Sequence, residues 1–311
     1  MKIEFLSSDG IHEREIRGAP LKRRRRSVSF FNRRGVACIL HRPWMENILD
    51  KKMQTVELIQ TNIGSFYIDT RDKFVGKELA ETGDYSPAER GVYQNFISPE
   101  SNVLWLGAHI GAHVVPLSKQ VRSITAFEAN PETYEIFAQN LEINGCSNVN
   151  SFNLAANDVE GELEFVCNSE NSGGSKRMPK EMNDMYLDKD TKFVNVRAVG
   201  LDDFLDNHKF DFVFMDIEGS ETAALKGMPK ILSHAKVVVS EFIPHHLRLV
   251  AGVTLSEFLD PLNAFQTLIV PSLRSHVHGP EIYFFLQRML SSNRGDPGLI
   301  FHKDVINVNW G

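Results

Sequence analysis

Glycines and acidic residues follow several short apolar runs of the chain, and their types suit ligand binding and catalysis. Gly107 and Gly111 follow one run, Glu128 ends the next, and Asp216 and Glu241 end two later ones. In an open parallel sheet, ligands bind beyond the carboxyl ends of the strands. These residues are therefore candidates for one common site.

The first two features predict a nucleoside site. The segment Gly107-Ala108-His109-Ile110-Gly111 allows a tight turn and a close approach of backbone amides to a ligand. Glu128 can accept hydrogen bonds from both hydroxyls of an adenosine ribose, as in NAD sites. The glycine loop lacks the G-x-G-x-x-G spacing that seats a pyrophosphate, which favours a nucleoside without phosphates.

The acidic residues after the later runs are candidates for catalysis. Asp216 closes an apolar run, so we expect a raised pKa or a positively charged ligand. Glu218 and Glu221 begin the next helix, where they either contact an acceptor or stabilise the positive helix end. Glu241, with His245 and His246 after it, places a carboxylate and two imidazoles near the same rim.

A metal site is not predicted. His276 and His278 are two residues apart before Gly279, but the spacing places no third ligand with them. We therefore expect a polar turn at this point.

The elements that must position these residues are repeated βα units. Short apolar runs alternate with amphipathic stretches from residue 102 onward, which predicts a mostly parallel sheet. Asn130 as N-cap, Pro131 and the later Gly145 delimit a helix. The expected strands are 103–106, 123–127, 210–217 and 236–240, with 265–270 and 282–287 as a closing pair and short lead-in strands from residue 55.

Composition and charge limit the class of protein. The net charge of −6 and pI near 6.0 argue against a surface built for nucleic acid, and no specific nucleic acid is expected. We divide the chain into a basic N-terminal extension (1–54), a catalytic domain (55–290) and a C-terminal tail (291–311). The run from Lys22 to Arg26 is either a handle for anionic partners or a solvated charged segment.

Three cysteines at no ligand or disulfide spacing, namely Cys38, Cys146 and Cys167, suit a reducing compartment and predict a cytoplasmic location. No run reaches the length of a membrane span. A homo-oligomer is compatible with the sequence.

Several motifs recur in an order that is specific to one family. They are Val103 to Gly111, Ala126 to Pro131, Asn140-Leu141 with Asn144, Ala155 to Asp158, Leu201 to Leu205, Met215 to Glu221 with Leu225 to Gly227, and Gly83 to Glu89 upstream. In these motifs the chain resembles the FkbM family of S-adenosylmethionine (SAM)-dependent methyltransferases over roughly residues 66–245. The D-x-E-G-x-E element at Asp216 is the most specific piece.

The resemblance implies a Rossmann-like class I methyltransferase fold, with a mostly parallel seven-stranded sheet, helices on both faces and SAM as cofactor. It implies that the glycine loop lines the methionine part of SAM, that Glu128 holds the ribose, and that Asp216 lies at the floor. The expected cofactor-binding residues are Tyr85, Glu89, Gly107, Ala108, His109, Gly111, Glu128, Ala129, Ala156, Asp158 and Asp216. The expected catalytic residues are Asp216, Glu241 and His245, and Glu218, Glu221 and His246 are expected to bind the acceptor.

The chain departs from the family pattern at three positions. Trp105 stands where an acidic residue is usual, His109 where Asn is usual, and Phe214 where Lys is usual. The predicted function is O-methylation of a small-molecule or saccharide acceptor. A catalytically degenerate binding or scaffold protein is the alternative that these departures support, and a nicotinamide-dependent oxidoreductase is a weaker one.

Overall fold

The computed structural model describes residues 55–308, which belong to one compact unit. The expected extension 1–54, with its Lys22 to Arg26 run and Cys38, lies outside the described residues. Among the described helices, none is long and apolar enough to cross a membrane.

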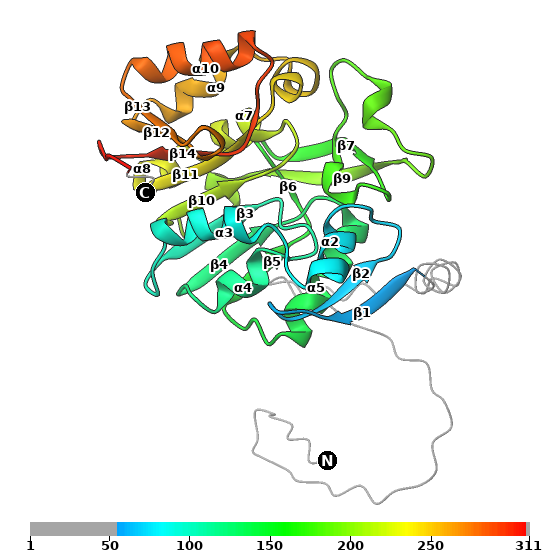
Figure 1. The fold of residues 1–311 in the computed structure, drawn as a ribbon. Coiled ribbons are helices and arrows are strands. Elements are labelled where there is room, and N and C mark those ends of the chain that lie inside the picture. Colours follow the sequence, from blue (N-terminus) through cyan, green and yellow to red (C-terminus); the bar gives the residue numbers. More distant parts are fainter. Residues whose placement is uncertain (1–54, 309–311) are drawn as a thin grey trace, which may run out of the picture. The chain divides into compact units, whose positions relative to one another are not determined.

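Five parallel strands form the larger part of the main sheet, up to the edge at β5 (Figure 1). They are β3 (Asn102–Leu106), β4 (Ser123–Phe127), β5 (Val149–Phe152), β10 (Phe212–Met215) and β11 (Val237–Phe242), in the order β5-β4-β3-β10-β11. The chain therefore fills the sheet outward from β3 in one direction and from β10 in the other. The carboxyl ends of β3 and β10 meet at this switch point, where α/β folds bind ligands.

Three more strands extend the sheet beyond β11. Strand β14 (Asp296–His302) lies antiparallel between β11 and β12 (Thr267–Val270), and β13 (Ser275–His278) pairs antiparallel with β12 at the edge. The predicted Rossmann-like, mostly parallel sheet is confirmed, although it has eight strands, one more than expected. His276 and His278 lie in edge strand β13 and not in the expected turn.

Two boundary predictions near the C-terminus are wrong. Residues 282–287 belong to helix α10 (Glu281–Ser291), in which Ile282, Leu286 and Met289 are buried at helical spacing. The expected tail from residue 291 includes strand β14, whose residues Leu299 to Phe301 are buried inside the sheet. Short apolar runs have no period of their own, so tertiary packing decided both elements.

Helices cover both faces of the main sheet, because its strands are apolar on both sides. On one face, Val103, Trp105 and Phe214 pack with residues of the N-terminal helices. On the other face, Leu104 and Val213 pack with residues of the C-terminal helices. The first group contains α2 (Val75–Thr82), α3 (Pro87–Tyr93), α4 (Val114–Ser118) and α5 (Pro131–Ile143), and the second contains α7 (Glu221–Lys226), α8 (Pro229–His234), α9 (Leu255–Leu259) and α10.

Helix α5 confirms the predicted helix, because the side chain of Asn130 accepts a hydrogen bond from the Glu132 amide at its start. The lead-in strands are also confirmed: β1 (Val56–Gln60) and β2 (Ser65–Asp69) form an antiparallel hairpin.

A second, four-stranded sheet was not expected from the sequence. Its order is β6-β9-β7-β8, and it lies between β5 and the short helix α6 (Leu201–Phe204) along the chain. Its strands are β6 (Ala155–Asn157), β7 (Gly161–Cys167), β8 (Lys176–Arg177) and β9 (Lys192–Gly200).

Candidate functional site

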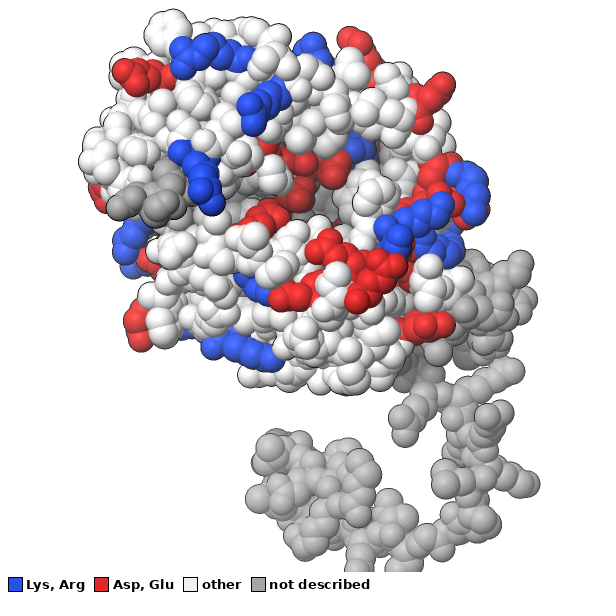
Figure 2. Space-filling model, viewed as in Figure 1, with Lys and Arg blue, Asp and Glu red and all other residues white. Residues whose placement is uncertain are grey.

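A cavity of about 350 Å³ lies at the carboxyl ends of β3 and β10. Figure 2 shows a hollow on this face of the molecule, with acidic side chains gathered in and beside it. Its volume falls in the range of small-molecule pockets. Nine of the expected cofactor-binding residues line it: Tyr85, Glu89, Gly107, Ala108, His109, Glu128, Ala129, Ala156 and Asp216.

The other two expected cofactor residues, Gly111 and Asp158, do not line the cavity. Gly111 has a φ of +88°, and a Cβ there would lie 2.8 Å from the Phe137 ring, so this glycine permits helix packing. Asp158 is exposed beyond β6.

Gly107 is required where the loops after β3 and β10 touch. Its φ is +83°, and a Cβ would lie 1.9 Å from the backbone oxygen of Asp216. Only glycine fits this position, for both conformational and steric reasons. The glycine loop and Asp216 are therefore held against one another in the cavity wall.

Glu128 is fixed by backbone donors. Its Oε2 accepts a hydrogen bond of 2.8 Å from the His109 amide, and its Oε1 accepts one of 2.8 Å from the Asn130 amide. Burial raises the pKa of Glu128 to about 7, although these hydrogen bonds oppose the shift. Each carboxylate oxygen keeps a second lone pair with which it can accept a ligand hydroxyl.

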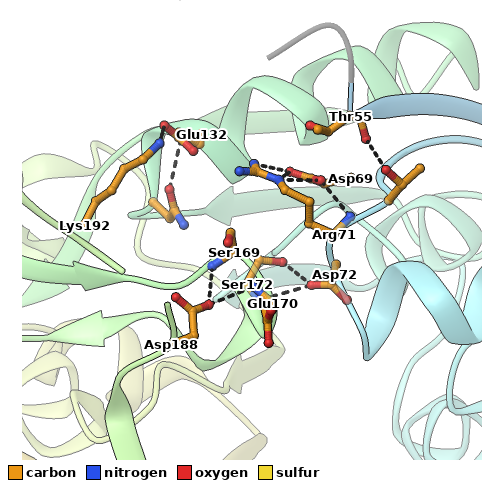
Figure 3. A network of polar contacts seen from close by, with 12 residues as sticks. Thr55, Asp69, Arg71, Asp72, Glu132, Ser169, Glu170, Ser172, Asp188 and Lys192 are labelled. Carbon is orange, nitrogen blue, oxygen red and sulfur yellow. Dashed lines mark hydrogen bonds and ion pairs between the residues drawn. The ribbon is translucent and has the colours of Figure 1, made fainter. Parts of the chain in front are cut away.

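His109 joins the glycine loop to the segment 168–175, which borders the cavity. Its φ is +50°, a conformation that Asn and His adopt more readily than most residues. Its Nε2 lies 2.6 Å from the Ser172 hydroxyl, which donates a short hydrogen bond to Asp72. Figure 3 shows the contact between Ser172 and Asp72 and the neighbouring one in which Asp188 accepts hydrogen bonds from the amides of Ser169 and Glu170. These hydrogen bonds fix residues 169, 170 and 172 of the segment in place.

Trp105 and Phe214, two of the three departures from the family pattern, are direct neighbours. They are register partners on β3 and β10, and their rings stack at 3.9 Å with an interplanar angle of 15°. Both are buried and both line the cavity. The two departures therefore form one compatible pair, an aromatic floor beneath the cavity.

His113 packs on this floor, 5.8 Å from the Trp105 ring. Burial, reinforced by Arg90, lowers the pKa of His113 to about 3, so its imidazole is neutral. The Nδ1 atoms of His109 and His113 are buried and have no hydrogen-bond partner among the described residues. Both side chains line the cavity.

Asp216 presents a free carboxylate to the cavity. Protein surrounds Asp216, and the part of its surface that is exposed lines the cavity. No described residue donates a hydrogen bond to the carboxylate, whereas its amide binds the Leu106 carbonyl. Burial, together with the charges of Glu218 and Glu221, raises its pKa well above the ordinary value. A positively charged ligand would offset the repulsion among these carboxylates and stabilise the ionised form of Asp216.

Glu218 connects the cavity to a buried charged cluster. It lines the cavity with a φ of +56°, and its Oε2 lies 2.5 Å from Lys176 Nζ. Lys176 Nζ also lies 3.3 Å from Nε2 of His246, whose Nδ1 lies 2.9 Å from Glu241 Oε2. Burial raises the pKa of Glu241, while burial and the Lys176 ammonium lower that of His246.

The same cluster has the spacing of a metal site. Ligand atoms of Glu218, Glu241 and His246 lie within 4.8 Å of one another. The Lys176 ammonium, which contacts two of them, already supplies positive charge there.

The expected catalytic and acceptor residues are divided between the cavity and this cluster. Asp216 and Glu218 line the cavity, whereas Glu241 and His246 lie behind Glu218. His245 does not line the cavity, and its Nδ1 lies 3.0 Å from the Tyr186 hydroxyl. The carboxylate of Glu221 accepts the Ile217 amide at the start of α7. Their roles stay predictions.

Sequence reasoning missed Lys176, Ser172 and His113. Lys176 and Ser172 lie in a segment rich in Ser, Asn and Gly, a composition that is typical of a flexible loop. No local pattern marks one lysine of such a loop as buried. Only the pairing of β8 with β7 places Lys176 beside the loop after β10.

The fold and the cavity define a Rossmann-like α/β protein with a cavity at its switch point, where such folds bind ligands. The family model described as "Methyltransferase FkbM domain" matches residues 106–265. The chain belongs to the FkbM methyltransferase family.

Among curated relatives, the chain is similar to the hexuronic acid methyltransferase AglP of Haloferax volcanii. The two are 24% identical over 146 residues, which cover 46% of this chain and 56% of AglP. The chain thus spans about half the length of this curated relative.

Solved structures similar to this one include an FkbM methyltransferase from Methylobacillus flagellatus. It has 17% identity and a TM-score of 0.36, and the match covers 66% of this chain and 44% of that one. A putative transferase from Pyrococcus horikoshii has 13% identity and a TM-score of 0.41, with 80% and 72% covered.

Proposed function

We propose that this protein binds SAM in the cavity between β3 and β10 and transfers its methyl group to an oxygen atom of a small or sugar-containing acceptor. The observation that carries the proposal is the free carboxylate of Asp216, held against the glycine loop in a cavity with no hydrogen-bond donor for it among the described residues. SAM carries a sulfonium and an ammonium group, so it fits an acidic cavity.

The residues of the first cavity wall, which β3 and β4 form, would bind the cofactor. Glu128 has both oxygens fixed by backbone amides and keeps lone pairs for the ribose hydroxyls. Gly107 and Ala108 bring backbone close to the ligand, and the Trp105–Phe214 floor offers aromatic rings to a cationic group. Bound SAM supplies an electrophilic methyl group.

The residues of the second cavity wall, which β10 and the loop after it form, would accept the proton that the acceptor hydroxyl loses. Asp216 is our candidate base, because it alone of Asp216, Glu241 and His245 lines the cavity, and a raised pKa makes a carboxylate a stronger base. Glu241 and His246 would act through Glu218, by fixing its position from behind. The segment 168–175 would help to exclude water.

A saccharide acceptor is supported by the relative AglP, whose name specifies a hexuronic acid. The alternative is a binding or scaffold protein that does not use SAM. The departures at Trp105, His109 and Phe214 motivate it.

Calorimetric titration with SAM, S-adenosylhomocysteine and NAD separates these functions. Binding of both adenosyl compounds without NAD is the expected result. Glu128→Gln should weaken this binding at least about tenfold, the loss expected for one hydrogen bond to a charged group. Asp158→Asn is the matched control, because Asp158 is exposed outside the cavity. Absence of adenosyl binding to the wild type would favour the scaffold function.

A further inference from the structure

The charge of the cavity wall limits the chemistry of the acceptor. Four carboxylates line the cavity, those of Glu89, Glu128, Asp216 and Glu218. No lysine or arginine of the described residues lines it. A site that binds an anionic acceptor ordinarily offers Arg or Lys to the carboxylate or phosphate.

Two cationic side chains that contact cavity-lining residues are already engaged. Lys176 is 4% exposed and contacts Glu218 and His246, and its ammonium lies 4.9 Å from the centre of the Tyr186 ring. Arg90 is 9% exposed, forms an ion pair of 2.7 Å with Asp84 and donates to the Tyr85 carbonyl. Freeing either one for an anionic acceptor would leave a half-buried carboxylate, that of Glu218 or Asp84, without its partner.

Bound SAM does not neutralise this wall. Its sulfonium, ammonium and carboxylate leave one net positive charge, and Lys176 adds one more. These two charges face the three carboxylates of Glu89, Asp216 and Glu218, besides Glu128, whose pKa is about 7. Burial and the neighbouring carboxylates already raise the pKa of Asp216, and burial raises that of Glu89. Room therefore remains for at least one further positive charge in the cavity.

We propose that the acceptor carries a protonated amine, which the carboxylates of Glu89 and Glu218 hold, so that the substrate class is an amino sugar or a similar amine-bearing hydroxyl compound. A protonated amine has no lone pair, so it serves as a handle, and the methyl group goes to a neighbouring oxygen. This inference rests on the proposed function. It differs from the acidic sugar named for AglP.

Three sugars that differ in one group test the charge preference. The full-length protein is first saturated with S-adenosylhomocysteine and then titrated with glucosamine, glucose and glucuronate, with binding followed by NMR. The expected order is glucosamine, then glucose, then glucuronate, with steps of about tenfold, the effect of one charge-assisted hydrogen bond on affinity. Added salt should weaken glucosamine binding more than glucose binding.

Two variants locate the preference. Glu218→Gln should reduce the ratio of glucosamine to glucose affinity about tenfold, because it removes one charge from the cavity wall. Glu142→Gln makes the same charge change on the exposed side of α5 and should leave the ratio unchanged. Unchanged binding of S-adenosylhomocysteine in the variants would show that the cavity is intact.

The two proposals fail in different ways. No binding of S-adenosylhomocysteine removes the proposed function itself. Normal binding of it, combined with equal affinities, tighter glucuronate binding or no glucosamine binding, overturns only the amine acceptor. Magnesium chloride is titrated in parallel, and a magnesium ion that abolishes the glucosamine preference would assign the carboxylates to a metal and also overturn it.

Discussion

The two walls of the cavity carry acidic residues in opposite states. On the wall formed by β3 and β4, Glu128 is held by two backbone amides. On the wall formed by β10, Asp216 has no hydrogen-bond donor among the described residues, and Glu218 depends on one buried lysine. The first wall is thus complete before any ligand binds, whereas the second wall needs a positive charge from a ligand. This difference suits a fixed cofactor end and a charge-selective acceptor end.

The largest effect is expected where the two walls join, at Trp105 and Phe214. Trp105→Asp removes a buried ring and leaves an unpaired buried charge, so we expect a loss of at least about 5 kcal/mol in the free energy of unfolding. Adding Phe214→Lys should recover about 2 kcal/mol, because the two positions are register partners and the new charges can pair. Urea denaturation of the wild type, both single variants and the double variant measures this coupling. If the losses in unfolding free energy of the two single variants simply add in the double variant, Trp105 and Phe214 are not energetically coupled.

Gly107→Ala is expected to have the next largest effect. The new Cβ would overlap the Asp216 carbonyl at a φ of +83°, so the two walls must separate, at a cost of about 3 to 5 kcal/mol. Gly145→Ala is the control, because Gly145 also has a positive φ of +62° but nothing lies near its Cβ. Urea denaturation should show the larger loss for Gly107→Ala, and equal losses would contradict the contact between the walls.

The pH dependence of stability probes the first wall. The pKa of Glu128 is raised to about 7 from an ordinary 4.5, so the folded protein binds a proton that the unfolded chain has released between these values. Its contribution to stability is therefore full below pH 4.5 and is lost as the pH rises through 7, by about 3 kcal/mol. The difference in unfolding free energy between wild type and Glu128→Gln should shrink over this range. A constant difference would mean that Glu128 is ionised throughout.

The smallest effect is expected on the second wall, and it has the opposite sign. Asp216→Asn removes a charge that faces other carboxylates, so the ligand-free protein should gain about 1 kcal/mol of stability at pH 8. Asp158→Asn, an exposed control, should change little. Thermal unfolding with and without S-adenosylhomocysteine measures both. Destabilisation by Asp216→Asn would show that this carboxylate has a partner and that the two walls are alike.

Much of the fold could be predicted because its signals are local. The runs that became β3, β4, β10 and β11 are short and apolar, and Asn130 with Pro131 starts α5 as expected. The segment at 282–287 was misassigned because a short apolar run is compatible with either a strand or a buried helix. Strand β14 was missed because a short apolar run after a helix carries no sign of where in a sheet it will insert.

Gly107, Glu128 and Asp216 could be predicted because strand ends and a glycine mark them in the chain, whereas the other six predicted cavity residues came from the family resemblance. The cluster behind them could not. Lys176 reaches Glu218 across 42 residues, and His246 reaches Lys176 across 70. Such contacts depend on how β8 and the segment after β11 are packed.

By itself, the sequence determined the family, the parallel part of the sheet and the positions at which strands end beside a ligand, because alternation, glycine and motif order are properties of neighbouring residues. Tertiary structure alone decided which carboxylates are satisfied and which are not. In the folded protein Trp105 pairs with Phe214, and backbone amides donate hydrogen bonds to Glu128. No described residue donates one to the carboxylate of Asp216. The charge state of a buried group depends on atoms brought close from distant parts of the chain, and no local pattern records them.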